Sequence, residues 1–319
     1  MKYIDRKGNM TIEENGQDKL LRHLYSDRGG KLCLRILVRP FVSKLAGIFL
    51  NSGLSAGMIP GFVQRNGIAP ADYEEAVYHS YNDFFTRKIR PELRPVAKGG
   101  QTLVSPCDGK VTVLRIGRDS RFYIKDTEYT IEQLLKSKSL ATRYRGGYAV
   151  ILRLTVDDYH HYCYPAEGVK SANVHLPGKF HTVNPAANDV FPVYAENTRE
   201  YTLLQTARFG TLLMMEVGAM LVGKISNLHK GPRKVEKGEE KGWFEFGGST
   251  VVLLIQPGKV RLDYDLIENS ENGYETIVRM GERIGEQKSS KRTGTCSNKS
   301  LFKMKASRSS LWDMEDFVL

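Results

Sequence analysis

Cysteine is scarce in this 319-residue sequence, which has only four cysteines, far apart and with no CxxC pair. That spacing excludes a disulfide-stapled scaffold and favours a reducing compartment. Long apolar runs are also lacking, because the longest stretch without a charged residue, 45–64, contains four glycines and a proline. We therefore expect no transmembrane helix. The polar N-terminal segment lacks the apolar core of a secretory signal.

Acidic residues are outnumbered, since 47 Lys and Arg against 36 Asp and Glu give a net charge of +11. On its own this charge is compatible with nucleic acid, an anionic membrane or an acidic substrate as partner. The excess lies at the ends: residues 1–65 hold 11 basic and 5 acidic side chains, residues 288–319 hold 7 and 3, and residues 66–287 hold 29 and 28. Without a recognised nucleic-acid-binding motif, we expect no nucleic-acid partner, while an anionic membrane and an acidic substrate stay open at this point.

The segment 31–62 reads as two apolar helical pieces whose only charges are positive, with Arg35 and Arg39 on one helical face. Such a segment either packs on a core or lies in a lipid interface, and the pattern alone leaves both open. The run DYEEAVYHSYNDFF, residues 72–85, predicts one helix opened by acidic residues. After it, short Val/Ile/Leu/Tyr runs bounded by Gly, Pro and Asp predict strands, with a helical interruption near Ile131.

Neither βαβ alternation nor an internal repeat is visible in these runs. We therefore predict an α+β fold with a mostly antiparallel β-sheet body and flanking helices. The predicted organisation is a basic and apolar N-terminal region over 1–65, a folded body over 66–287, and a tail over 288–319. The tail is rich in Ser and Lys, so we expect it to be flexible.

The sequence FGGST stands just before the apolar run VVLLI. A double glycine adopts backbone conformations closed to other residues and leaves the Gly248 carbonyl sterically open. The Ser249 hydroxyl can attack that carbonyl, which transfers the acyl group from N to O and gives an ester. Elimination from the ester, followed by hydrolysis with loss of ammonia, would leave a pyruvoyl group on the new N-terminus. The alternative is an ordinary turn entering a strand, and FGGST alone does not decide between the two.

Two further segments carry acid–base side chains. Asp108 lies in SPCDGK, where the Asp-Gly pair is typical of a turn. Both a structural and a catalytic role for Asp108 therefore stay open. In the segment DDYHHYCYP, histidines stand close to aspartates, and this combination of side chains commonly transfers protons near neutral pH. Strand alternation sends His161 and Cys163 to one face and His160 to the other. No second cluster completes four ligands, so we expect no metal site.

Together these motifs resemble phosphatidylserine decarboxylases, specifically the bacterial group with GGST at its cleavage site. The resemblance runs from about residue 81 to 285, and it also places the apolar basic segment where these enzymes carry membrane-associating helices. It implies phosphatidylserine in membranes as the substrate and peripheral attachment to the cytoplasmic side of the cell membrane. The motifs are NDFFTRKIRPELRPV, SPCDGKV, IKDTEYTIEQLL, DDYHHYCYP, HTVNP, AENTREY, FGTLLMMEVGAMLVGKI, KGEEKGWFEFGGST and MGERIG.

In this family the serine of GGST is both the nucleophile of self-cleavage and the source of the pyruvoyl cofactor. That serine is Ser249 here, so the resemblance implies cleavage after Gly248 into a β chain, 1–248, and an α chain, 249–319, held as a heterodimer. Whether heterodimers associate further stays open. The pyruvoyl group acts as the electron sink for decarboxylation to phosphatidylethanolamine. GGST alone also fits a pyruvoyl enzyme for another head group, which the other motifs argue against.

The resemblance also implies roles for further residues of this sequence. Asp108 matches the aspartate of the cleavage relay, and His160 matches the DYH histidine assigned to decarboxylation. Cys163 departs from the pattern, because the family usually has a histidine there as the base, and a thiol with a pKa of about 8.5 is a poorer base. His181 and His161 are candidates for a rebuilt relay, and we favour His181. The alternative that Cys163 motivates is an uncleaved, non-enzymatic homologue that binds anionic lipid.

Overall fold

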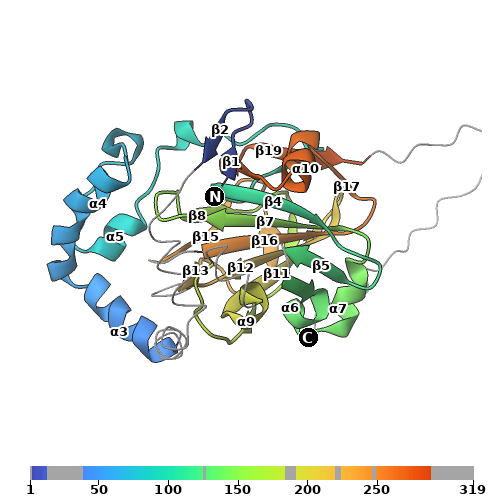
Figure 1. The fold of residues 1–319 in the computed structure, drawn as a ribbon, viewed down its shortest axis with the longest axis horizontal. Coiled ribbons are helices and arrows are strands. Elements are labelled where there is room, and N and C mark those ends of the chain that lie inside the picture. Colours follow the sequence, from blue (N-terminus) through green and yellow to red (C-terminus); the bar gives the residue numbers. More distant parts are fainter. Residues whose placement is uncertain are drawn as a thin grey trace, which may run out of the picture.

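The computed structural model describes residues 2–12, 39–124, 127–183, 192–219, 224–245 and 249–288. These residues form one large sheet, three smaller sheets and a group of helices at one side of the body (Figure 1). Nearly all strand pairs are antiparallel, so the predicted α+β fold with a mostly antiparallel body is confirmed. The predicted tail lies outside the described residues, apart from Lys288.

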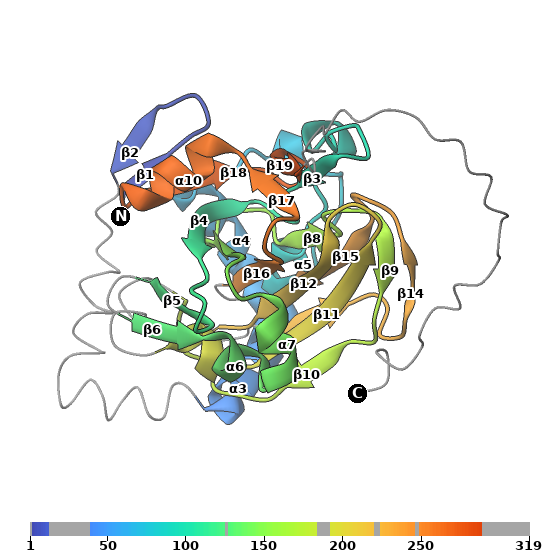
Figure 2. The ribbon, with the colours of Figure 1, turned by 90° about the vertical axis from the view of Figure 1, so that its right-hand side faces the viewer.

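The large sheet has 11 strands and forms the centre of the body (Figures 1 and 2). From one edge to the other they are β14 (Arg233–Val235), β9 (Gly168–Lys170), β11 (Arg199–Thr206), β12 (Gly210–Val217), β16 (Ser249–Ile255), β7 (Tyr148–Leu154), β4 (Gly109–Arg115), β18 (Glu275–Val278), β1 (Lys2–Ile4) and β2 (Met10–Ile12), with β10 (Val174–Leu176) paired to β11.

The core lies on both faces of this sheet, because its central strands are almost uninterrupted apolar runs. Along β16, Val252 and Leu254 join one hydrophobic cluster, and Val251 and Leu253 join the other. The first cluster includes α6 (Ile131–Leu135), which precedes α7 (Lys138–Arg143), and the second includes Leu266 of α10 (Tyr264–Glu271). All of β16 is buried between them.

The smaller sheets flank this core and account for the other predicted strand runs. Helix α10 is a feature that the sequence analysis did not identify. The remaining elements of the body are β13 (Ile225–Asn227), β15 (Glu240–Phe244) and β8 (His161–Cys163) in one sheet, β17 (Val260–Leu262), β19 (Arg283–Gln287) and β3 (Thr102–Val104) in a second, β5 (Arg121–Ile124) and β6 (Thr127–Thr130) in a third, and the short helix α9 (Val193–Glu196).

The first residues of the chain belong to the large sheet. Strand β1 pairs in parallel with β18, where Tyr3 lies opposite Glu275. Just after it, the Arg6 guanidinium binds the carboxylates of Asp263 and Asp265 at 2.9 and 2.7 Å. These contacts tie the start of the chain to its last described elements. The predicted N-terminal region, 1–65, therefore contributes two strands, β1 and β2, to the body as well as helices.

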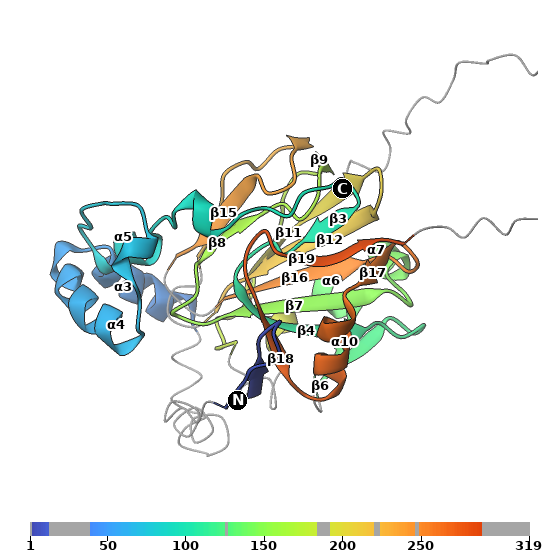
Figure 3. The same ribbon diagram turned by 90° about the horizontal axis from the view of Figure 1, so that it is seen from above.

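The helical group consists of α3 (Pro40–Leu50), a 3₁₀ turn (Gly53–Met58), α4 (Ile59–Arg65), two further 3₁₀ turns (Pro70–Asp72 and Pro91–Leu93) and α5 (Tyr81–Phe85). It stands at one end of the body when seen from above (Figure 3). Within the part of the chain that the structure describes, no single helix is long and apolar enough to span a membrane. The segments Phe41–Leu50 and Gly53–Arg65 meet that test only as a pair, bent by 78°.

The predicted helix over 72–85 is wrong, because only α5 is helical there. Tyr73 forms a β-bridge with Ile89, and the Glu74 amide donates to the Lys88 carbonyl at 2.8 Å. Pairing with a neighbouring segment therefore overrides the local helical pattern. Helix α5 starts where Ser80 caps it, since the Ser80 hydroxyl accepts from the Asp83 amide.

Candidate active site

Ser249 begins β16 and lies opposite Leu154, the last residue of β7. Its side chain is fully buried, and among the described residues its Oγ has no hydrogen-bond partner. An unsatisfied buried polar group costs about 1–3 kcal/mol, so its persistence calls for an explanation such as a reactive role. The preceding residues 246–248, which include the predicted cleavage residue Gly248, lie outside the described residues.

His160 lies at the same end of the sheet, after the turn that follows β7. Its carbonyl accepts from the amide of Phe244, the residue that ends β15 shortly before Ser249. Its Nδ1 lies 2.8 Å from the Asp158 carbonyl oxygen, which can only accept, so Nδ1 carries the proton. Nε2 is then the proton-free nitrogen, and it is buried without a hydrogen-bond partner among the described residues. The Phe85 ring packs against the imidazole, with ring centroids 4.1 Å apart.

The turn that carries His160 is held by a buried lysine. Lys110 Nζ binds both carboxylate oxygens of Asp158, at 2.8 and 2.9 Å, and the Thr155 hydroxyl at 2.6 Å. Asp158 also accepts from the Thr155 amide at 2.7 Å. Because Thr155 directly follows the ladder partner of Ser249, Lys110 fixes the turn relative to the serine as well as the histidine.

Burial lowers the pKa of His160 to about 3. Between that value and the ordinary pKa of about 6.5, the unfolded chain binds a proton that the folded chain does not, so acidification destabilises the fold. We expect this one group to lower the free energy of unfolding by up to about 1.4 kcal/mol per pH unit in that window. Urea titrations of wild type and His160→Asn at about pH 7 and about pH 4.5 check this, because the variant should lose less stability. Equal losses would contradict it.

Asp108 and Cys163 come together on the neighbouring segments. The Cys163 amide donates to the Pro106 carbonyl at 2.7 Å, and the Cys163 Sγ lies 3.8 Å from the Ser105 carbonyl oxygen. Burial raises the pKa of the Cys163 thiol to about 12, and the nearby Asp108 charge acts in the same direction. The thiol is therefore protonated at physiological pH and cannot act as the base of a relay.

The Asp108 carboxylate is already occupied by other groups. It forms a bidentate pair with Arg94, with Nε at 2.7 Å from Oδ1, and it accepts from the Met280 amide at 2.8 Å. Burial raises its pKa, while Arg94 works against that shift. The next residue, Gly109, has a φ of 151°, and a Cβ there would lie 2.8 Å from the Arg153 carbonyl oxygen. The close approach of β4 and β7 therefore requires glycine beside Asp108.

The two candidate substitutes for the relay base differ in their surroundings. His161 has Nδ1 at 2.7 Å from a Glu240 carboxylate oxygen and Nε2 at 3.0 Å from the Thr86 carbonyl oxygen. Both of its ring nitrogens therefore face acceptors. Its ring is also stacked between Tyr159 and Trp243. The hydrogen-bonding positions of both His161 nitrogens are thus already taken by Glu240 and Thr86.

His181 is anchored near the last residues of β12, which lie beside the start of β16 and therefore near Ser249. Its amide donates to the Asn197 side chain at 2.9 Å, and the same side chain donates to the His181 and Gly218 carbonyls, each at 2.8 Å. Gly218 follows Val217, the ladder partner of the residue after Ser249. The His181 Nε2 lies 3.5 Å from a Glu196 carboxylate oxygen, and burial lowers the pKa of its imidazole.

A cavity of about 690 Å³ lies between α3 and the body. Its walls include Ser43 of α3, Glu200 of β11 and Glu245, which follows β15. Ser43 is buried, and its Oγ has no partner among the described residues. Glu245 accepts from Lys224 at 2.6 Å and from Ser226 at 2.9 Å. The sequence analysis missed these lining residues, because they come from distant segments that share no motif.

Comparison with known proteins shows the family to which this chain belongs. The family model for phosphatidylserine decarboxylase matches residues 81–286. The chain is 41% identical over 274 residues to "Phosphatidylserine decarboxylase proenzyme 2" of Clostridium acetobutylicum, covering 86% of this chain and 92% of that protein. It is 37% identical over 291 residues to the proenzyme of Chlamydia caviae (89% and 97%) and 36% over 294 residues to that of Fusobacterium nucleatum (90% and 98%). The chain therefore belongs to the phosphatidylserine decarboxylase family of carboxy-lyases.

Proposed function

We propose that this chain converts phosphatidylserine into phosphatidylethanolamine with a pyruvoyl group made from its own Ser249. The observation that carries the proposal is the buried Ser249 hydroxyl at the start of β16, directly after the double glycine, which has no hydrogen-bond partner among the described residues. Family membership and the word "proenzyme" in the names of the relatives support it. Cleavage after Gly248 would leave β16 as the first strand of the α chain, held between β7 and β12 of the β chain.

The surroundings of Ser249 fit a pyruvoyl group. The group is small and has no charge, so it suits a position that is fully buried among apolar strands. When present, it supplies an electron sink for the pair released as the carboxylate leaves. The described residues then have two tasks, which are to exclude water around residue 249 and to handle the protons.

We assign His160 to proton handling in the decarboxylation step. Its low pKa keeps the imidazole neutral at physiological pH, so the Nε2 lone pair stays available in a buried site. The Asp158 carbonyl fixes the tautomer, and Lys110 fixes Asp158. The imidazole is thus oriented before substrate arrives.

For self-cleavage, we propose that His181 replaces the relay histidine lost at Cys163. Its lowered pKa and its anchoring through Asn197 support this choice, and the occupied ring of His161 argues against the alternative. We expect His181→Ala to slow chain cleavage by a factor of about 100 or more, the usual effect of removing a general base. The matched variant His161→Ala should cleave at the wild-type rate. Denaturing gels over time measure both rates, and cleavage of His181→Ala at the wild-type rate would overturn the assignment.

We propose that α3 and the turn after it attach the protein to the membrane. Their outer face exposes large apolar side chains: Phe41 is 67% exposed, Phe49 is 49% and Leu54 is 85%. The inner face of α3 lines the 690 Å³ cavity, so a lipid substrate could pass from the membrane to the site under this helix. Peripheral attachment on the cytoplasmic side is part of the same proposal.

Substitution on α3 tests the attachment. Full burial of one large apolar side chain contributes about 1.5–3 kcal/mol, so we expect Phe41→Ser/Phe49→Ser to weaken binding to phosphatidylserine vesicles at least about tenfold. Val77→Ser is the control, since Val77 is 80% exposed but lies outside the helices. Co-sedimentation measures both, and equal binding by the double variant and wild type would contradict the proposal. Deleting residues 1–65 is a poorer test, because it also removes β1 from the large sheet.

Incubation of the purified full chain with phosphatidylserine vesicles tests the activity itself. We expect phosphatidylethanolamine to accumulate and carbon dioxide to be released in equal amounts. Vesicles that are bound but unchanged would favour the rival function, a non-enzymatic lipid-binding protein.

A further inference from the structure

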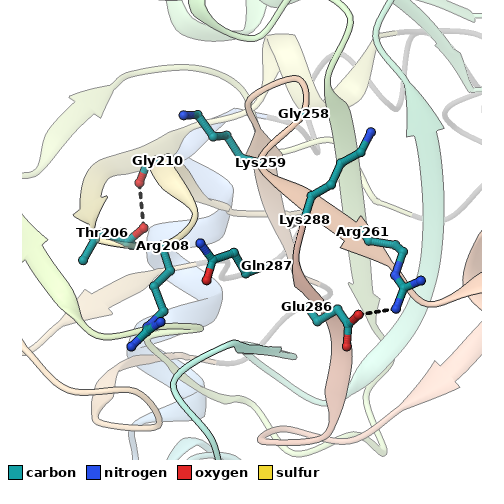
Figure 4. A pocket seen from close by; sticks show the side chains of 10 residues that line it. Thr206, Arg208, Gly210, Gly258, Lys259, Arg261, Glu286, Gln287 and Lys288 are labelled. Carbon is teal, nitrogen blue, oxygen red and sulfur yellow. Dashed lines mark hydrogen bonds and ion pairs between the residues drawn. The ribbon is translucent and has the colours of Figure 1, made fainter. Parts of the chain in front are cut away.

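A second cavity, of about 880 Å³, lies at the other end of β16 from Ser249. Its wall is formed by the β11–β12 turn, the β16–β17 turn, β17 and the end of β19 (Figure 4). We call it the basic cavity, because four of its lining side chains are cationic and one is acidic: Arg208, Lys259, Arg261, Lys288 and Glu286.

The positive charge of the basic cavity is largely uncompensated. Glu286 is paired with Arg261. The other three cations, Arg208, Lys259 and Lys288, have no carboxylate partner among the described residues, and Figure 4 shows them extending from three separate segments of the wall. Like charges gathered in one concave site repel one another and raise the local concentration of anions.

The backbone around these cations is fixed by hydrogen bonds. The Thr206 hydroxyl donates to the Gly210 carbonyl and accepts from the Phe209 amide, each at 2.8 Å, which closes the β11–β12 turn. The Gln256 side chain accepts from the Thr211 amide at 2.7 Å, which joins the second turn to the first. The Lys288 amide donates to the Lys259 carbonyl at 3.0 Å. The cavity is therefore preformed, and a ligand would have to order only the side chains.

We propose that the basic cavity binds a soluble anion that carries two or more phosphate groups. Its volume is within the range of small-molecule sites, of roughly 300–1,000 Å³. Three cations on separate segments, with no carboxylate partner in the described part of the chain, suit several linked charges better than one. Arg and Lys are the residues that bind phosphate. A lipid head group would present the same chemistry, but the cavity lies far from α3 and α4, on the opposite side of the body (Figure 1). This site does not depend on the reaction proposed for Ser249.

Calorimetry with inorganic tripolyphosphate tests the proposal on the full chain in metal-free buffer. We expect saturable binding to wild type and at least tenfold weaker binding to Arg208→Gln/Lys259→Gln. The control Arg118→Gln/Lys138→Gln removes two exposed positive charges elsewhere and should bind within twofold of wild type. Thermal unfolding of each variant verifies that it is folded.

Two results would overturn the proposal. One is the absence of a specific site, seen either as equal weakening in both double variants or as no saturable binding to wild type. The other is a loss of binding to phosphatidylglycerol vesicles in Arg208→Gln/Lys259→Gln with no change for tripolyphosphate, which would assign the cavity to a membrane surface.

Discussion

Ser249→Ala is expected to remain a single chain of 36.0 kDa and to release no detectable phosphatidylethanolamine from phosphatidylserine vesicles. The variant removes the only atom that we assign to attack on the Gly248 carbonyl, so neither the new N-terminus nor the pyruvoyl group can form. Denaturing gels and lipid analysis measure the two effects.

The fold should tolerate this change. The Ser249 Oγ has no hydrogen-bond partner among the described residues, so removing it breaks none of the described contacts. The control is Thr250→Val, which removes the hydroxyl of the next residue and keeps its shape. Strand alternation directs Thr250 to the opposite face, so this variant should still be cleaved. Cleavage of Ser249→Ala at the same bond would exclude Ser249 as the nucleophile.

The second large effect is expected from His160→Asn, which should be cleaved normally but should decarboxylate phosphatidylserine about 100-fold or more slowly than wild type. Asparagine can place an amide nitrogen where Nδ1 donates to the Asp158 carbonyl, and it removes the Nε2 lone pair. The turn should therefore persist while the proton-handling atom is lost. The measurement is the rate of product formation per cleaved chain.

Normalising by cleaved chain separates the two proposed roles. His79→Asn is the control, because His79 is exposed and lies outside the candidate site. If His160→Asn blocks cleavage as well, His160 also acts in maturation and its role is not confined to decarboxylation. If His160→Asn decarboxylates at the wild-type rate, the assignment of His160 is wrong.

The strands were predictable because a strand that is buried on both faces is a continuous apolar run, which can be recognised from the local sequence. The run STVVLLI contains no charged residue, and all of it is buried in β16. The family motifs likewise selected Ser249, Asp108 and His160 as candidates from local sequence, and their roles stay predictions. The fold class followed from many such runs without intervening long helices.

Features that depend on distant partners were not predictable. The segment 72–85 has a helical pattern, yet Tyr73 pairs with Ile89 and only α5 is helical. Strand β1 reads as polar, and it pairs with β18 near the other end of the chain. The neighbours of Asp108 also could not be read from its motif, since Arg94 and Met280 approach from separate segments.

The most direct test of the central claim is the mass of the purified wild-type protein under denaturing conditions. The account predicts two chains, 1–248 and 249–319, with the shorter one lighter by one ammonia than a chain that begins with serine. Borohydride reduction should add two hydrogens to it, as expected for a ketone. One intact species of 36.0 kDa would contradict the account, and so would a shorter chain with a free amino-terminal serine.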